Sequence, residues 1–427
     1  MIKLAGRDLP RGLFAAEYKR FSPRVGLAWQ FMPKTVFRAG AGIFYSQTMW
    51  LEQQAAVVNP PFFASATLTG DIRTPDILLD QLLPKIDPAN PGPNIGPRSF
   101  ALPYRTPYAT QWNANVQHAF TPDLLWESGY AGSSGRRVGL RYDQNQAVLD
   151  RPGVTTPIAL RRPYPQYAET QTYANIGKSS YHSFFNRVER RFKSGFTVLG
   201  TWTWSHAMDT GINDTPKSDV RGNVAGSDWI NINWASSNLD QRHVFVTSLI
   251  YELPFGPGKA LLSGGGVPGK IFGGWQINAL TTFASGRPVD ITISGDRANV
   301  GTSVAGTQRP IRTGPGNCSE CRDSLRDRPR PTDYFRIADF TLPAVGTFGN
   351  SGRNPILGPG LNNWDLGLAK LTRLHERVSL QFRAEFFNTF NHAQFNPPAG
   401  SVNGAGFGSI TSAREARDIQ LALKLIF

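Results

Sequence analysis

The chain has 427 residues, of which 43 are Gly and 32 are Pro, while 11% are aromatic and only 18% are charged. This composition favours strands joined by many turns over helices packed through Leu and Ala, so it predicts an all-β fold. The 45 Lys and Arg outnumber the 31 Asp and Glu, which gives a formal charge of +14. Because the basic residues are scattered along the chain, we do not expect nucleic acid as a partner, and anionic lipid headgroups fit the charge better.

The sequence excludes a membrane-spanning helix. Its longest uninterrupted apolar runs, such as 55–58, fall far short of the roughly 18 residues that such a helix needs. The first residues, MIKLAGRDLPRGLF, lack the apolar stretch of about 7–15 residues that marks a secretory signal. We therefore expect either a cytoplasmic protein or a chain whose beginning is missing.

Apolar residues recur at every second position in many segments, as they do in strands. In chain order we expect eleven strands, at 21–31, 34–45, 108–119, 124–133, 181–192, 196–206, 242–253, 273–283, 363–371, 377–388 and 417–427. A strand tilted through a bilayer needs about 9–11 residues, whereas strands of soluble sheets typically have about 5–6. The length of these segments therefore favours a membrane protein.

The connections between these strands alternate in length. Short links are expected at 32–33, 120–123, 193–195 and 372–376, an intermediate one at 254–272, and long ones at 46–107, 134–180, 207–241, 284–362 and 389–416. Outer-membrane barrels have short periplasmic turns and longer extracellular loops, so this alternation predicts a transmembrane antiparallel β-barrel with long extracellular loops. The last strand would then descend and place Phe427 on the periplasmic side.

Two sets of side chains would mark the faces of such a barrel. The apolar positions of the last strand would face lipid: Leu421, Leu423, Leu425 and Phe427. Polar positions of three strands would line the lumen with amides and ion pairs: Gln111, Asn113, Asn115, Gln117, Gln276, Asn278, Gln381, Arg383 and Glu385. For each of these polar residues taken alone, a structural role in the barrel wall is the favoured interpretation. A functional role is expected only of the surface that they form together.

Seven of the ten Trp residues fall within the expected strands: Trp29, Trp112, Trp126, Trp202, Trp204, Trp275 and Trp364. A barrel would use them as girdles at the two membrane interfaces. Packing in a core is the alternative for any one of them, although such a core would need a second apolar sheet to cover it.

No motif supports an enzyme. GGGVPGK at 264–270 resembles the start of a phosphate-binding loop, but Ile271 stands where Ser or Thr is required, and a strand pattern follows where a helix is required. GAGFGS at 404–409 lacks the context of a dinucleotide-binding loop and is expected to be an ordinary loop. The six His are dispersed without metal-ligand spacing, so we expect no catalytic, metal or cofactor site.

Two further features lie in one expected loop. Cys318 and Cys321 have no His nearby, so a local disulfide or two free thiols fits them better than a zinc site. The run at 322–336 mixes charges and contains Pro, which predicts a solvated outer loop. Contact with lipopolysaccharide phosphates or an anionic ligand is the functional alternative for this run.

Several stretches resemble one known family. The closing segments NWDLGLAKLTRLHERVSLQFRAEFFNTFNHAQFNPP and FGSITSAREARDIQLALKLIF are similar to the C-terminus of Oar-like TonB-dependent receptors, which are numerous in acidobacteria. FSPRVGLAWQFMPKTVFRAGAGIFYSQ and YHSFFNRVERRFKSGFTVLGTWTWSHAMD resemble earlier hairpins of that family. The alternating apolar residues that lead to Phe427 are similar to the signal by which such proteins reach the barrel-assembly machinery.

The resemblance implies an integral outer-membrane protein of a Gram-negative bacterium, embedded in lipid and lipopolysaccharide. It implies about 22 strands, an N-terminal plug, a motif that engages TonB and often a carboxypeptidase-regulatory-like domain. None of these N-terminal parts, nor a signal peptide, is visible, so we expect residues 1–427 to form the C-terminal half of the barrel, about 11 of about 22 strands. The implied function is TonB-coupled uptake of an unidentified substrate. A passive structural or adhesion barrel and a secreted soluble carbohydrate-binding protein are the alternatives.

Overall fold

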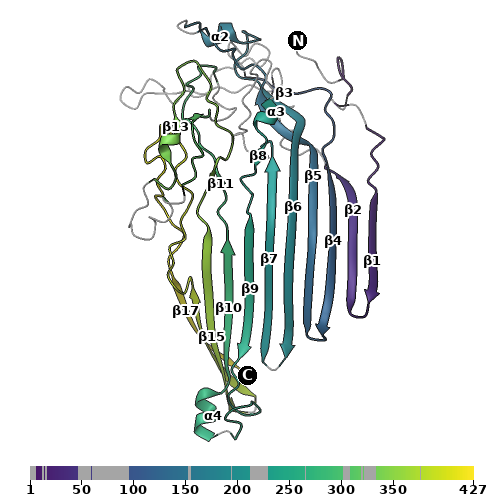
Figure 1. Ribbon diagram of the computed structural model, residues 1–427, viewed down its shortest axis with the longest axis vertical. Helices are drawn as coiled ribbons and strands as arrows, with labels where there is room; N and C mark the ends of the chain where they lie inside the picture. Colours follow the sequence, from purple (N-terminus) through teal and green to yellow (C-terminus); the bar gives the residue numbers. More distant parts are fainter. Residues whose placement is uncertain are drawn as a thin grey trace, which may run out of the picture.

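The computed structural model describes residues 6–11, 14, 17–46, 59, 96–151, 155–193, 195–211, 229–264, 266–301, 308–318, 321, 333–375 and 377–427. Eleven long strands form one curved antiparallel wall and follow each other in chain order (Figure 1). They are β1 (Arg24–Met32), β2 (Thr35–Tyr45), β4 (Tyr108–Thr121), β5 (Leu124–Asp143), β6 (Gln171–Lys193), β7 (Phe196–Asp209), β9 (His243–Glu252), β10 (Trp275–Ala284), β15 (Leu361–His375), β16 (Val378–Phe387) and β17 (Asp418–Ile426). All eleven expected strands are confirmed.

The two ends of the wall differ in their connections (Figure 1). Tight turns join β1 to β2, β4 to β5, β6 to β7 and β15 to β16 at one end, here named the turn end, where the C-terminus also lies. Lys34 in the first of these turns and Gly195 in the third have φ of 65° and 81°, the left-handed conformation that tight turns use. Long connections gather at the opposite end, the loop end. In the described part of the chain β1 and β17 form the two edges of the wall and do not pair.

The longest strands correct the expected loop at 134–180. β5 continues to Asp143 and β6 begins at Gln171, so that much of this segment is strand. Past Arg136, which pairs with the first residue of β4, the two strands form a ribbon that projects beyond the loop end of β4. The short strand β3 (Arg98–Phe100) pairs in parallel with this ribbon. In this ribbon β5 and β6 pair with each other, and the start of β6 also pairs with β3.

The link between β9 and β10 contains the helix α4 (Gly266–Phe272) at the turn end (Figure 1). Alternation gave no sign of this helix, which overlaps the motif GGGVPGK. A phosphate-binding loop is nevertheless excluded, because its lysine precedes a helix, whereas Lys270 lies in the last turn of α4. β10 follows directly, as the strand pattern predicted.

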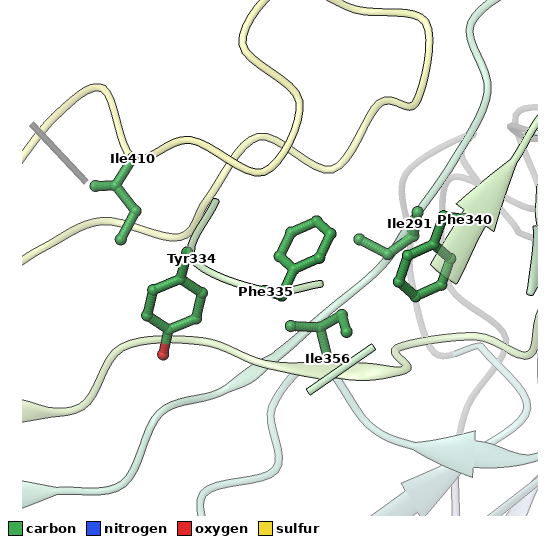
Figure 2. Packing of buried hydrophobic residues seen from close by; sticks show 6 residues of the cluster. All are labelled: Ile291, Tyr334, Phe335, Phe340, Ile356 and Ile410. Carbon is green, nitrogen blue, oxygen red and sulfur yellow. The ribbon is translucent and has the colours of Figure 1, made fainter. Parts of the chain in front are cut away.

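A hydrophobic cluster organises the loop end. Figure 2 shows its six buried residues, which come from the connections β10–β15 and β16–β17: Ile291, Tyr334, Phe335, Phe340, Ile356 and Ile410. Tyr334 and Phe335 are only 2% and 1% exposed, so the expectation of a solvated loop at 322–336 is wrong for these positions. Aromatic side chains supply much of the buried area in small cores, which explains why this pair anchors the segment. Residues 322–332 lie outside the described residues.

Short elements complete the loop end: α2 (Ile158–Arg161), α3 (Trp229–Ile232), β8 (Ala235–Ser236), β11 (Pro288–Val289), β12 (Ile311–Arg312), the 3₁₀-helix η3 (Ile337–Asp339), β13 (Phe340–Thr341) and β14 (Ile356–Leu357). GAGFGS at 404–409 lies in the loop before β17, where Phe407 packs against the hydrophobic cluster. Among the described residues, no helix has the length and apolar character needed to cross a membrane.

Candidate functional site

Strand alternation places the polar residues of β4 on one face of the wall. Gln111, Asn113, Asn115 and Gln117 occupy every second position of this strand. Arg38 of β2 donates a hydrogen bond to the side-chain oxygen of Gln117, so the neighbouring strand contributes to the same face. We name this surface the polar face.

Strand pairing extends the polar face across the wall, because residues directly opposite each other in an antiparallel pair project to the same side. From Asn115 the register passes through β5, β6, β7 and β9 to Ala284 of β10, which has the same parity as Gln276 and Asn278. Asn278 lies opposite Gly367 of β15, and Gly367 lies opposite Glu385 of β16. The structure therefore brings together on one face every residue that the sequence suggested for a lumen.

Ion pairs and amide contacts connect the side chains of the polar face. Arg187 of β6 lies 2.6 Å from Glu189 and 4.0 Å from Glu127 of β5. Arg383 lies 2.5 Å from Glu385 on β16. The arginines in these pairs are partly exposed. Exposed ion pairs contribute about 0–1 kcal/mol each to the free energy of unfolding, so these pairs add charged groups to the surface more than they stabilise the fold.

Sequence reasoning missed Glu127, Arg187 and Glu189. The signal was present, because Glu127 and the Arg187–Glu189 pair alternate with Trp126 and Val188 in strands that had been predicted. Only the register shows that Glu127 and Arg187 are opposite each other. The charged part of the polar face is therefore larger than the sequence alone indicated.

The opposite side of the wall is apolar. Leu421, Leu423 and Leu425 alternate along β17 and lie opposite Ala384, Phe382 and Leu380 of β16 in the register. The three leucines are exposed, and so is Phe427, which follows the last residue of β17. We name this surface the apolar face.

All seven tryptophans expected in strands have the parity of the apolar face. Trp29, Trp126 and Trp275 lie toward the turn end of their strands. The other four lie toward the loop end: Trp112, Trp202, Trp204 and Trp364. Two Trp-bearing zones separated along the strands match the pattern of aromatic girdles in membrane barrels.

Buried polar contacts fasten the loops of the loop end to the wall. Arg353, from the β10–β15 connection, forms a buried ion pair with Asp209 at the end of β7, and one of its Nη atoms also donates to the Asp209 carbonyl at 2.7 Å. Arg309 donates to the Oδ1 of Asn233 at 2.7 Å. These contacts join segments far apart in sequence, so no local pattern could have predicted them.

The tip of the β5–β6 ribbon holds a buried carboxyl group. Oδ1 of Asp143 accepts hydrogen bonds from the backbone N–H of Asn145 and of Thr170, both at 2.8 Å. These bonds close the base of the loop between the two strands. Burial raises the pKa of Asp143 to about 6, while the two hydrogen bonds act in the opposite direction.

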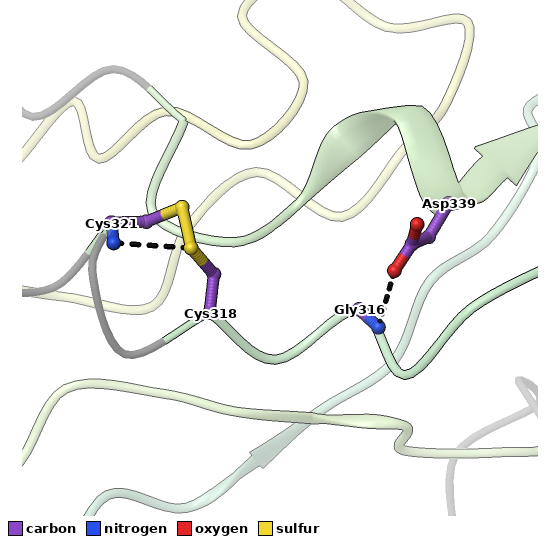
Figure 3. The surroundings of a disulfide bond; sticks show 4 residues. All are labelled: Gly316, Cys318, Cys321 and Asp339. Atoms are coloured by element: carbon purple, nitrogen blue, oxygen red, sulfur yellow. Dashed lines mark hydrogen bonds between the residues drawn. A yellow bond between two sulfur atoms is a disulfide. The ribbon is translucent and has the colours of Figure 1, made fainter.

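Cys318 and Cys321 form a disulfide, which settles the choice that the sequence left open (Figure 3). Close to it, the backbone N–H of Gly316 donates to Oδ2 of Asp339 at 2.8 Å. The disulfide precedes the basic segment 322–332 in the chain, and the hydrogen bond joins Gly316 to the 3₁₀-helix η3 that follows it. Contact of that basic segment with an anionic ligand stays a prediction.

Three of the six His side chains contact polar side chains of other segments. His118 contacts Thr35 Oγ1 at 2.7 Å, His182 contacts the Tyr130 hydroxyl at 2.5 Å, and His206 lies 3.2 Å from Asp240. Within the described ranges, no three His, Cys, Asp or Glu side chains are grouped as a metal ion would require.

Comparison with solved structures shows the fold. The outer membrane transporter YddB from Escherichia coli superposes with a TM-score of 0.50 at 10% identity, over 95% of this chain and 40% of that one. The FrpB iron transporter from Neisseria meningitidis has a TM-score of 0.41 at 10% identity and covers 95% of this chain and 39% of its own. The ferric citrate transporter FecA has a TM-score of 0.42 at 10% identity and covers 95% of this chain and 38% of its own. This chain thus spans less than half the length of these transporters. No curated protein sequence matches it.

A family profile described as outer membrane beta barrel domain matches residues 1–420. The antiparallel wall, its tight turns at one end and its long loops at the other agree with this match. The chain therefore belongs to the outer-membrane β-barrel domain family and is a protein of the outer membrane.

Proposed function

We propose that this chain forms part of the barrel of a TonB-dependent receptor that imports a substrate across the outer membrane. The observation that supports this proposal most is the polar face, which carries amides or ion pairs on β2, β4, β5, β6, β10 and β16 and continues in register to β17. A closed barrel with this face inward would have a polar lumen of the kind that admits water-soluble compounds. The similarity of the closing segments to Oar-like receptors supports a member of that type.

In this proposal the apolar face would meet lipid. Leu421, Leu423 and Leu425 would contact acyl chains, and the Trp zones would lie at the two headgroup layers. The loop end would face outward, near lipopolysaccharide, because long loops are extracellular in bacterial barrels. Phe427 at the turn end would then be available in the periplasm to the barrel-assembly machinery.

Energy for import would come from TonB, which couples such receptors to the inner-membrane proton gradient. The functional unit would be the whole receptor, of which residues 1–427 would provide about half of the barrel strands. The substrate would enter from the loop end and pass along the polar face. No enzymatic step is part of this proposal.

The proposal is tested by comparing what cells remove from a complex medium. Four strains are grown, with and without the receptor gene and with and without a working TonB, and the spent media are compared by mass spectrometry. A compound depleted only when both are present supports import. Equal depletion in all four strains, together with receptor-dependent adhesion to surfaces, favours a passive structural barrel.

Once a depleted compound is known, the polar face can be tested directly. Arg187→Gln alters the charge of the polar face, and Asn186→Ala changes its neighbour on the apolar face. Uptake should fall with the first variant and persist with the second, at equal receptor levels in the membrane. Equal loss with both would show that the polar face does not select the substrate.

A further inference from the structure

The β9–β10 connection, of which the structure describes residues 253–264 and 266–274, forms a knob at the turn end. The Leu261 N–H donates to the Pro254 carbonyl and the Gly256 N–H to the Leu261 carbonyl, both at 2.8 Å. A Cβ on Gly256 would lie 2.9 Å from the Cα of Gly273, so the two segments of the connection approach each other closely. This β9–β10 knob is therefore a packed structure, unlike the tight turns beside it.

The knob exposes large apolar side chains although its backbone is ordered. Leu261 is 51% exposed, Val267 70%, Ile271 53% and Phe272 57%, and the last three belong to α4. Val267 and Ile271 are four residues apart and therefore adjoin on the surface of α4. Exposure of several large apolar side chains to water is unfavourable, and such a surface marks a site that contacts protein or membrane. The position of the knob distinguishes between these partners.

Two side chains fasten α4 to the apolar face. Lys370 Nζ donates to the carbonyls of Lys270 and Ile271 at 3.0 and 2.5 Å, and Trp275 Nε1 donates to the Ile271 carbonyl at 3.0 Å. Lys370 also lies over the Trp275 ring, 5.0 Å from its centroid. Trp275 and Lys370 are opposite each other in the register and share the parity of the apolar face. The C-terminus of α4 is therefore held at the rim of the apolar face.

We propose that α4 is an interfacial anchor that inserts Val267, Ile271 and Phe272 into the phospholipid leaflet at the turn end. The knob continues the apolar face, to which the proposed function assigns lipid, and it adjoins the zone that contains Trp275. Lys270, in the last turn of α4, places positive charge beside the apolar residues, as in helices that lie at anionic headgroups, whereas Lys259 is paired with Glu252. The occupant is a lipid surface that contains anionic phospholipid.

The inference rests on the lipid assignment of the apolar face, and one experiment tests the two separately. Because both native cysteines are in a disulfide, a spin label attaches only to an introduced cysteine. Val267→Cys and Phe272→Cys report on the knob, and Ala279→Cys on the apolar face of β10. Thr121→Cys, at the last residue of β4 before the turn to β5, is the aqueous reference. The full-length protein is reconstituted in vesicles of phosphatidylethanolamine and phosphatidylglycerol.

Collision rates of the labels with oxygen and with a water-soluble nickel chelate give their depth. Labels at 267 and 272 should give an oxygen-to-nickel ratio between those of the Ala279 and Thr121 labels and several-fold above that of the Thr121 label, because an interfacial helix lies shallower than the middle of a strand. The anchor is overturned if both labels match the Thr121 label while the Ala279 label lies in lipid, as expected if a periplasmic protein covers the knob. A water-exposed label at 279 would overturn the lipid assignment of the face as well. Two labelled knob positions keep the test informative if one variant does not assemble.

Discussion

Adjacent residues of β17 belong to opposite faces and should respond differently to charge. Leu423 has the parity of the apolar face, whereas Ala422 lies opposite Arg383 on the polar face. We predict that Leu423→Arg lowers the free energy of unfolding by about 2–4 kcal/mol, because a charge near the bilayer midplane loses its hydration. Ala422→Arg should be milder. Denaturant unfolding in lipid vesicles measures both, and equal losses would contradict the assignment of faces.

The buried pair Asp209–Arg353 should matter for the loop end. Arg353→Met leaves the Asp209 carboxylate buried without its cation, and the loss of one partner from a buried pair costs about 3–5 kcal/mol. We predict much faster hydrogen exchange at the end of β7 and in the β10–β15 connection. The double variant with Asp209→Asn should recover most of the protection. No recovery in the double variant would show that packing of the arginine stem, and not its charge, is what matters.

Asp143 predicts a pH dependence at the tip of the β5–β6 ribbon, outside the part of the wall that spans the membrane. Its pKa is raised from 3.8 to about 6 by burial, so the folded state holds the proton more tightly than the unfolded chain. The resulting stabilisation is full below pH 3.8 and disappears as the pH rises through about 6. The N–H groups of Asn145 and Thr170 should therefore exchange more slowly at pH 5 than at pH 7, after correction for intrinsic rates. Asp143→Asn should remove this difference, and an unchanged difference would assign it to another group.

Single residues were predictable only where their role follows from strand parity. Gln111 and Leu421 could be placed on their faces because every second side chain of a strand projects to the same side. Arg353 and Asp209 could not be paired from sequence, because 144 residues separate them and neither lies in a repeating pattern. Tyr334 and Phe335 were misread because charged neighbours hid two aromatic residues that pack in the cluster.

Glycines on the apolar face show how neighbouring strands pack. A Cβ on Gly132 of β5 would lie 2.4 Å from the Trp112 ring of β4, whereas one on Gly200 of β7 would approach only Thr247 Oγ1, at 3.8 Å. We predict that Gly132→Ala displaces Trp112 and lowers stability by about 1–3 kcal/mol. Gly200→Ala should change it by less than about 1 kcal/mol. Unfolding in vesicles compares the two, and similar effects would mean that Trp112 does not pack over Gly132.

The strands of the wall were predictable because each has one apolar face. Side chains of a strand alternate between its two faces, so the apolar residues recur at every second position. The outer part of β5 escaped because Gly135, Arg136 and Arg137 interrupt the alternation, which resumes only at Val138, Leu140 and Tyr142. Short strands such as β11 and β14 pair across a long connection and have only two residues each. α4 was missed because its exposed apolar residues do not follow a repeating pattern.

For the whole molecule, the order of the strands followed from the sequence, since each short link predicted an antiparallel neighbour. The packing of the loop end could not be predicted from the sequence, because its hydrophobic cluster joins connections that begin more than a hundred residues apart, as with Ile291 and Ile410. The wall is open between β1 and β17 in the described residues, and the chain spans 40% of the YddB transporter. The import that we propose would therefore belong to a larger receptor that includes this wall.

The central claim, that one face of the wall meets lipid and the other a polar lumen, is tested most directly on β4. Single cysteines at positions 111 to 118 are spin-labelled in the full-length protein in vesicles, and collisions with oxygen and a nickel chelate are measured at each. The account predicts a ratio that alternates with period two, high at Trp112, Ala114 and Val116 and low at Gln111, Asn113 and Asn115. A ratio that does not alternate, or that is high at the polar positions, would contradict it.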